Sequence, residues 1–432
     1  MRLVKLKALV LVLLCGSGAV SCAGSGSGSG ASVTVLGPWT APEEAGFRAM
    51  LAGFEKQTGI RVDYTGTRDA DSVLASEIQN GRPPDAAVLA TPGELRQYAA
   101  AGTLRPIDGA LDQVRMAAEY GPGVRDLMTA AGPSGTPHSY GIIVKAALKS
   151  VIWYDPKRLP PSVSAVLTAR GLTWDRLIGA VAGLGTRPWC MGMEDTSNSG
   201  WPGTDWIEDL LLHQSGPQAY DQWVAGRLPW TSGQVRQAWQ AFGAVAARAG
   251  GGPGPILLTN FGSAGAPMFT APPGCFLDHE GSFIAADYAN DPTSPRPGTD
   301  FDFVPFPPVQ AGQGAEEIAG DLLGMFRDTP AARKLIGYLT TPAAQQAWIR
   351  LPTGGAISMN RAVPLSDYPD PVSRKIADNL THAGTVRFDG SDSMPHVMSS
   401  AFQHAVLEYL SDPGKLDVVL TALDKVRQSA YR

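Results

Sequence analysis

Strand-like and helix-like segments alternate from the start of the folded body, and this alternation constrains the fold more than any other feature of the chain. Four apolar residues recur at the helical spacing i, i+3, i+4 and i+7, namely Phe47, Met50, Leu51 and Phe54. Segments rich in β-branched and apolar residues predict strands at 32–36, 60–64 and 85–89, and a second helix is predicted at 72–80. Such alternation is typical of an α/β fold with a largely parallel sheet.

A second α/β lobe is indicated by the patterns that follow. The extended run at 140–154 is too long for one ordinary strand of a compact sheet, and it suits a strand that crosses between two lobes. Further strands are predicted at 301–305 and 318–326, and further helices at 174–184, 206–215, 235–249, 331–339, 342–348, 396–410 and 416–426.

The N-terminus has the features of a secretory signal. Arg2, Lys5 and Lys7 precede an apolar run at 8–14, which is shorter than the roughly 20 residues that span a bilayer. Small residues lead to Cys22, as in a bacterial lipobox, so we expect a lipoprotein signal peptide at 1–21 and acylation of Cys22. The alternative is an ordinary signal peptide with an incidental cysteine. The Gly/Ser repeat that follows predicts a flexible tether, giving an anchor and tether at 22–31.

The charge balance argues against two classes of partner. Without the signal, the chain has 32 basic residues and 40 acidic residues. Nucleic acid and anionic membrane surfaces both require a basic protein surface. We therefore expect no nucleic-acid partner, and contact with the membrane only through the lipid anchor.

Two cysteines, Cys190 and Cys275, remain in the body. An even number of cysteines in an exported protein predicts a disulfide. Two buried thiols are the alternative.

Five short blocks carry a resemblance to a known family. They read KSVIWYD at 149–155, WCMGME at 189–194, GWPGTDWIED at 200–209, AGDLLGMF at 319–326 and SDSMP at 391–395. Their order makes the chain resemble the carbohydrate-type extracellular solute-binding proteins of ABC importers, a family that includes the maltose-binding protein, and especially its α-glucoside-binding subgroup. The resemblance implies a two-lobed periplasmic-binding-protein-like α/β fold with crossing hinge strands, a carbohydrate ligand in the cleft between the lobes, and a membrane permease with its ATPases as partner.

The resemblance also implies how the chain divides. An N-terminal lobe is expected from 32–144 and 306–347, and a C-terminal lobe from 145–305 and 348–432. The hinges are expected near Lys145, Pro305 and Trp348. We expect a monomer held at the extracellular face of the cell membrane, without a cofactor.

Candidate ligand contacts are aromatic and charged residues, because a sugar presents apolar C–H faces and a rim of hydroxyl groups. The candidates are Trp39, Thr91, Lys145, Trp153, Glu194, Trp201, Asp205, Phe283, Asp321 and Asp392. Lys145 departs from the maltose-binding relative, which has a carboxylate near this position, and Phe283 and Phe402 lie near places where that relative has tryptophan.

Several candidates have a structural alternative. Trp39 follows the first strand, where ligands of open α/β sheets gather, but it can instead pack on the next helix. Trp153 and Tyr154 alternate on one strand, so only one of them can face a cleft. The role of Asp205 can be explained by a helix that begins near Thr204, with Trp206 in the core. Asp392 can instead cap the last helices, and Asp85 is expected to fix a turn.

Enzyme functions find less support in the sequence. The six histidines show no metal-ligand spacing, and neither a nucleophile elbow nor a phosphate-binding loop is present. We therefore expect a binding protein that is not an enzyme and holds no metal. Glu194 and Asp205 leave a glycoside hydrolase open, because such enzymes use two carboxylates. The sequence also leaves open a solute-binding protein for a non-sugar ligand, and a surface interaction lipoprotein without a small-molecule ligand.

Overall fold

The computed structural model describes residues 31–41, 43–184, 187–309, 314–351 and 356–432. The predicted signal peptide, Cys22 and the Gly/Ser repeat lie outside the described residues. Within these ranges, no helix is both long enough and apolar enough to cross a membrane.

The larger sheet has six strands and confirms the α/β prediction. Its order is β11-β10-β3-β1-β2, with β6 paired to β10 beside this path. The first three strands run parallel in the order β2-β1-β3, whereas β10 is antiparallel to both β3 and β6. The strands are β1 (Ser32–Gly37), β2 (Arg61–Gly66), β3 (Ala86–Leu89), β6 (Gly141–Leu148), β10 (Glu316–Met325) and β11 (Val386–Phe388).

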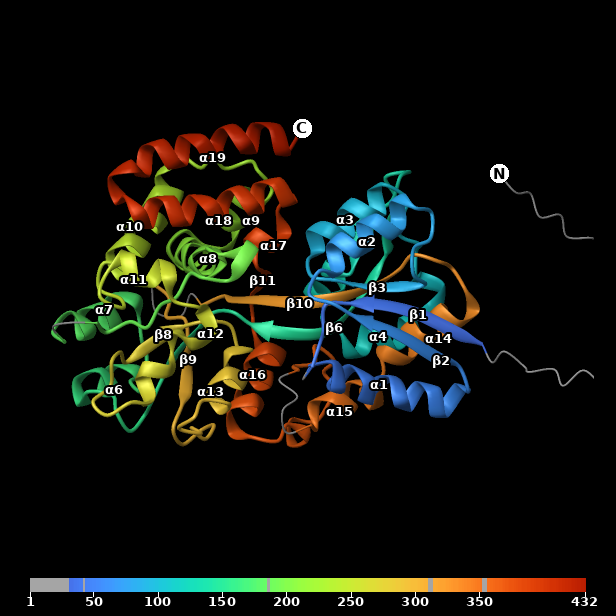
Figure 1. Cartoon of the computed structure of the whole chain (residues 1–432), viewed down its shortest axis with the longest axis horizontal. Coiled ribbons are helices and arrows are strands. Elements are labelled where there is room, and N and C mark those ends of the chain that lie inside the picture. The colour runs from blue at the N-terminus through green and yellow to red at the C-terminus, as the bar shows by residue number, and fades with distance from the viewer. Residues whose placement is uncertain (1–30, 42, 185–186, 310–313, 352–355) are drawn as a thin grey trace, which may run out of the picture.

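Helices pack around strands β1 to β3 to form the N-terminal lobe, on the right in Figure 1. The apolar stripe that predicted the first helix is buried, from Phe47 to Phe54, and packs with Trp39 and Trp348. The helices of this lobe are α1 (Glu43–Thr58), α2 (Ala70–Gln79), α3 (Pro92–Ala100), α4 (Gln113–Glu119), α5 (Pro122–Leu127), α14 (Pro330–Leu339) and α15 (Pro342–Ile349). A short hairpin joins β4 (Thr129–Ala131) to β5 (Pro137–Ser139).

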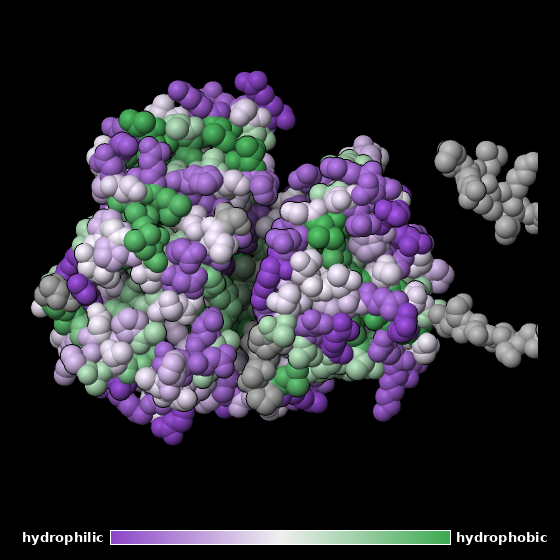
Figure 2. All heavy atoms as spheres, viewed as in Figure 1, coloured by the Kyte–Doolittle hydropathy of each residue, from purple (hydrophilic) through white to green (hydrophobic). Residues whose placement is uncertain are grey.

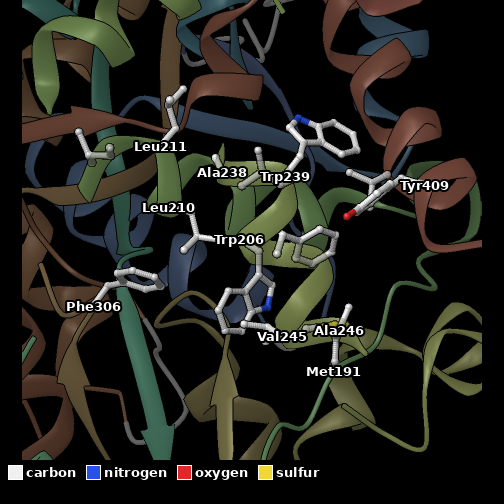
Figure 3. Close-up of a cluster of buried hydrophobic side chains, with 14 of the residues drawn as sticks. Met191, Trp206, Leu210, Leu211, Ala238, Trp239, Val245, Ala246, Phe306 and Tyr409 are labelled. Carbon is white, nitrogen blue, oxygen red and sulfur yellow. The ribbon is translucent and has the colours of Figure 1, made fainter. Parts of the chain in front are cut away.

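The C-terminal lobe, on the left in Figure 1, is mostly helical. Its small antiparallel sheet has the order β8-β7-β9, from Leu277–His279, Val151–Tyr154 and Asp302–Pro305. Figure 3 shows part of the core of this lobe, in which the Trp239 and Tyr409 rings pack with centroids 5.3 Å apart and Trp206 belongs to the same buried cluster. Its helices are α6 (Pro161–Leu167), α7 (Trp174–Ala182), α8 (Trp201–Ser215), α9 (Pro217–Val224), α10 (Gly233–Ala246), α11 (Pro253–Leu258), α12 (Phe261–Ala264), α13 (Ile284–Ala289), α16 (Pro371–His382), α17 (Gly390–Ser393), α18 (His396–Ser411) and α19 (Leu416–Ala430).

The predicted long strand at 140–154 is two strands. Strand β6 belongs to the large sheet and β7 to the small sheet, with a break at Lys149 and Ser150. The Phe306 backbone N–H donates to the Ser150 carbonyl over 2.8 Å, so the two chain passages lie together between the lobes. The run therefore crosses between the lobes as expected, but it changes sheet within the crossing.

A disulfide joins Cys190 and Cys275, whose Cα atoms are 5.3 Å apart, and confirms the predicted pair. Both cysteines are buried, and Cys190 extends the edge of the small sheet because its N–H donates to the Leu277 carbonyl over 2.7 Å.

Candidate functional site

A cavity of about 690 Å³ lies between the two lobes. Figure 2 shows that the surface is hollowed along the boundary between them. One wall comes from the start of α3 and from β6 and β10, and the other comes from α8, α13, α17 and α18. The cavity therefore lies beside the carboxyl end of β3, where ligands of open α/β sheets gather.

The helix α3 begins at this wall. Thr91 is its N-cap and accepts the Glu94 N–H over 3.0 Å, while the Glu94 carboxylate accepts the Ala90 N–H over 3.1 Å. This capping arrangement fixes both side chains at the cavity. Gly93 lies close to the opposite wall, since a Cβ atom there would come within 2.8 Å of the Met394 carbonyl oxygen.

Ion pairs hold the charged residues of the N-terminal wall. The Lys145 ammonium lies 2.5 Å from Glu43, and Arg68 lies 3.0 Å from the same carboxylate. Burial opposes ionisation of Glu43, but the two cations outweigh it and keep the pKa of Glu43 below its ordinary value. Asp321 stands opposite Lys145 in the sheet register, and burial raises the pKa of Asp321 to about 6.

Three aromatic rings form the apolar part of the C-terminal wall. Trp201 packs edge-on against Phe261 and Phe283, with ring centroids 4.9 Å and 5.7 Å apart. The Trp201 indole N–H donates to the Asp195 carboxylate over 2.9 Å. The indole therefore has a fixed orientation and remains partly exposed to the cavity, as a platform for the apolar face of a ligand requires.

A buried cation lies beneath these rings. The Lys149 ammonium is 2.6 Å from Asp205 and 3.1 Å from Asp389, and it lies 4.8 Å from the Trp201 ring centre. All three charged side chains are less than a tenth exposed. Burial alone lowers the pKa of Lys149, but the two carboxylates outweigh it and hold that pKa well above its ordinary value. Lys149 is therefore charged at neutral pH.

Hydrogen bonds of Ser150, the neighbour of Lys149, connect the crossing segment to both lobes. The Ser150 hydroxyl donates to Asp209 on α8 and accepts the Glu317 N–H of β10 over 2.8 Å. His279 Nε2 lies 2.7 Å from the Asp209 carboxylate. Every one of these side chains is buried, so the crossing is held by polar contacts inside the protein.

Seven of the ten predicted ligand contacts line the cavity, from both lobes. They are Thr91, Lys145, Trp201, Asp205, Phe283, Asp321 and Asp392. Whether each of them contacts a ligand stays a prediction.

Trp39 and Trp153 do not line the cavity, which corrects the expectation that their rings face a ligand. Trp39 is 2% exposed and packs edge-on against Trp348, with ring centroids 4.9 Å apart, behind the cavity wall, while its N–H donates to Asp321 over 3.3 Å. Trp153 is fully buried and donates to the Glu280 carbonyl over 2.8 Å. Trp39 also packs on Phe47 of the following helix α1, with ring centroids 4.8 Å apart, so the packing alternative that the sequence left open for Trp39 describes this structure.

Glu194 is also outside the cavity lining. Its carboxylate accepts the Thr196 N–H over 2.9 Å and the Asn260 amide over 2.8 Å, and these hydrogen bonds lower the pKa of Glu194. The residue therefore fixes the loop before α8.

Helix α8 begins at Trp201, before the predicted start near Thr204, so Thr204 lies inside it instead of capping it. Its N-cap is Gly200, which has φ 104°, a left-handed conformation that favours glycine. This early start places Trp201 in the first turn, at the cavity, and Trp206 in the core.

Sequence reasoning missed Glu43, Arg68, Glu94, Lys149 and Phe261 as cavity residues. Lys149 stands inside one of the five family blocks, which was the available signal. The others depend on where the fold places their side chains, which no local pattern in the sequence encodes.

A family model described as bacterial extracellular solute-binding protein matches residues 37–346. Among curated relatives, the chain is 33% identical over 397 residues to the osmoprotective compounds-binding protein GgtB of Synechocystis sp., covering 90% of this chain and 91% of that protein. It is 32% identical over 405 residues to the alpha-glucosides-binding periplasmic protein AglE of Rhizobium meliloti, covering 90% of this chain and 85% of that protein.

Solved structures share the fold. The solute receptor AcbH, whose description gives a preference for β-D-galactopyranose, superposes with a TM-score of 0.76 at 17% identity and covers 93% of this chain and 100% of its own. A chitin oligosaccharide binding protein gives a TM-score of 0.75 at 16% identity, covering 94% of this chain and 100% of its own. Both neighbours confirm the predicted two-lobed fold.

Proposed function

This chain belongs to the bacterial extracellular solute-binding protein family, and from that premise we propose that it captures a carbohydrate for an ABC importer. The observation that carries the proposal is the set of aromatic rings, led by Trp201 and Phe283, that faces a cavity with charged walls. Such a surface suits the C–H faces and the hydroxyl rim of a sugar. The name of the AglE relative favours an α-glucoside or another oligosaccharide.

The proposed mechanism is closure of the lobes on the ligand. Sugar rings would stack on Trp201, with hydroxyl groups bonded to Asp321 on one lobe, to Asp392 on the other and to Lys145 at the hinge between them. We propose that residues 32–144 and 306–347 move against 145–305 and 348–432, with hinges near Lys145, Pro305 and Trp348. A ligand that contacts both walls stabilises the closed form because it binds that form better.

The proposed setting is the outer face of the cell membrane. Export by the N-terminal signal, acylation of Cys22 and the Gly/Ser tether would leave a monomeric body free to meet the permease and its ATPases. We propose no nucleic-acid partner and no cofactor.

Catalysis is not part of the proposal. The curated relatives are named as binding proteins. The carboxylate pair considered for a glycoside hydrolase is not assembled at the cavity, because Glu194 lies outside the lining and Asp205 is buried against Lys149. A non-sugar solute is the alternative ligand, because the GgtB relative is named for binding osmoprotective compounds.

Calorimetric titration of the purified body with maltose, trehalose, sucrose, maltodextrins and small osmoprotectants tests the proposal. We expect saturable binding of at least one glucoside, with one ligand per protein and no release of cleaved sugar. Binding of only a non-sugar osmoprotectant, or no binding at all, would contradict the carbohydrate assignment. Steady product release would instead favour the enzyme.

A further inference from the structure

Two buried glutamates lie behind the cavity, where the large sheet meets the C-terminal lobe. Glu317 is on β10, and Glu208 is on α8. Both side chains are fully buried, and their carboxyl groups lie within hydrogen-bond reach of each other. Neither residue lines the cavity. Two carboxyl groups in contact inside a protein cannot both be ionised, so at least one of them holds a proton.

The hydrogen bonds around the pair indicate which glutamate holds this proton. The Glu208 carboxyl group accepts the Gly390 N–H over 2.5 Å and the Ser391 N–H over 3.2 Å. The Tyr220 hydroxyl also donates to it, over 3.4 Å. In contrast, no N–H or hydroxyl group within the described residues donates to either carboxyl oxygen of Glu317. Glu317 therefore has to supply the hydrogen itself, because a buried carboxylate without donors is costly.

Asp389 extends the pair to a row of three carboxyl groups. It contacts the Glu208 carboxyl group on one side and the Lys149 ammonium, at 3.1 Å, on the other. Burial opposes ionisation of Asp389, but Lys149 outweighs it and keeps the pKa of Asp389 below its ordinary value. Burial, and then the neighbouring carboxyl groups, raise the pKa of both Glu208 and Glu317 well above the ordinary value. The charge of the row therefore lies at the Lys149 end, and Glu317 stands at the other end.

The charged groups around Glu317 do not favour its ionisation. The acidic groups that face it are Glu208, Asp209, Asp389 and Asp205. Arg387 stands beside Glu317 in the sheet register, but its guanidinium donates to Asp221 on α9 over 2.6 Å and 2.9 Å. Lys149 pairs with Asp389, and His279 pairs with Asp209. In the described part of the chain, no cation therefore lies within 4.0 Å of the Glu317 carboxyl group.

A proton suits this row better than a metal ion. Within the described ranges, Asp205, Glu208 and Asp389 have oxygens within 4.8 Å of one another, as a shared ion requires. The Lys149 ammonium already lies 2.6 Å from Asp205 and 3.1 Å from Asp389, so a metal ion would have to displace it. A proton between Glu317 and Glu208 displaces nothing.

We propose that Glu317 keeps its proton at neutral pH and donates it to Glu208, and that this hydrogen bond is a pH-sensitive connection between the two walls of the cavity. Strand β10 also carries Asp321 on one wall, and α8 carries Trp201 on the other. Loss of the proton at alkaline pH places two like charges in contact and pushes β10 away from α8. The separation of the two walls then depends on pH.

Glu317→Gln tests this proton through stability. Glutamine keeps an N–H donor for Glu208 but cannot ionise. Because the pKa of Glu317 is raised in the folded protein, its contribution to stability is present below the pKa of the unfolded chain and is lost as the pH rises through the folded pKa. Above pH 5, we therefore expect the unfolding constant of the unmodified protein to rise by up to about tenfold per pH unit relative to that of the variant. Urea denaturation at pH 5, 7 and 9 measures both constants.

Glu77→Gln is the matched control. It makes the same chemical change on α2, at a partly exposed residue away from the row. The ratio of its unfolding constant to that of the unmodified protein should stay the same at all three pH values.

Infrared spectroscopy detects the proton directly. A protonated carboxyl group has a carbonyl stretching band that a carboxylate lacks. The spectrum of the unmodified protein at pH 7, minus that of Glu317→Gln, is expected to contain this band. An absent band, or a ratio of unfolding constants between unmodified protein and Glu317→Gln that is the same at all three pH values, overturns the proton on Glu317. Stabilisation by calcium that the variant lacks also overturns it, because a metal ion would then join the row.

Titration with the tightest-binding glucoside extends the test to the cavity, and this part rests on the proposed function. We expect the Kd of the unmodified protein to rise by about threefold or more from pH 7 to pH 9, relative to that of Glu317→Gln, because ionisation separates the walls. A ratio of Kd values that does not change with pH overturns the connection between the walls. If no glucoside binds to either protein, the proposed function fails, while the stability and infrared measurements still decide whether Glu317 holds the proton.

Discussion

Lys149→Met is expected to lower the free energy of unfolding by about 3–5 kcal/mol, because removing one partner of a buried ion pair leaves uncompensated charge. Asp205 and Asp389 lie 2.6 Å and 3.1 Å from the Lys149 ammonium, and both are almost fully buried. Methionine has nearly the same length but cannot pair with them. Urea denaturation at pH 7, followed by circular dichroism, measures the loss.

Lys145→Met is the matched control for this prediction. Its ammonium also pairs with a carboxylate, but Glu43 is more exposed than Asp205 and keeps Arg68 as a second partner at 3.0 Å. A partly exposed pair contributes about 1 kcal/mol or less. Equal losses of unfolding free energy in the two variants would show that the buried network does not hold the crossing segment in place. In Lys149→Met/Asp205→Asn, part of the loss should be recovered, because one unpaired charge is removed.

Trp201→Ala is expected to weaken carbohydrate binding by about 2 kcal/mol or more, which is about 30-fold in Kd. The indole is the largest ring on the cavity wall, and Phe261, Phe283 and the hydrogen bond to Asp195 hold it in place. Its loss removes the surface on which a sugar face stacks. Titration of the variant with the tightest-binding glucoside measures the change.

Trp201→Phe separates stacking from folding in this experiment. Phenylalanine keeps an aromatic face but loses the hydrogen bond to Asp195, so we expect a loss of less than about tenfold. The melting temperature of both variants is recorded first, because Trp201 packs on neighbouring rings. An alanine variant that folds normally and binds with unchanged affinity would remove Trp201 from the site.

Local patterns were enough to predict the alternation of helices and strands, whereas the closure of two lobes over a cleft was expected from the family resemblance. The helical spacing of Phe47, Met50, Leu51 and Phe54 predicted α1, and all four residues are buried. The parity of the cysteines predicted the disulfide between Cys190 and Cys275. The helix depends on the spacing of neighbouring residues, and the disulfide depends on the oxidising conditions outside the cell. Both can therefore be predicted without coordinates.

The candidate site was harder to predict, because contacts between segments that are distant in the sequence decide it. Trp39 follows a strand at the edge where ligands gather, yet Trp348, 309 positions later in the chain, packs on it from behind. Glu94 lies in an ordinary capped helix, and burial together with the nearby Asp71 charge raises its pKa to about 7. Patterns within one helix or strand cannot reveal such pairings. They predict which way a side chain points, but not which distant residue it contacts.

A crystal structure of the folded body (residues 31–432) with its tightest-binding glucoside tests the central claim most directly. We predict a sugar ring stacked on Trp201 in the cavity between the lobes, with hydroxyl groups within hydrogen-bond distance of Asp321 on one lobe and Asp392 on the other. A sugar bound elsewhere on the surface, with this cavity holding only water, would contradict it.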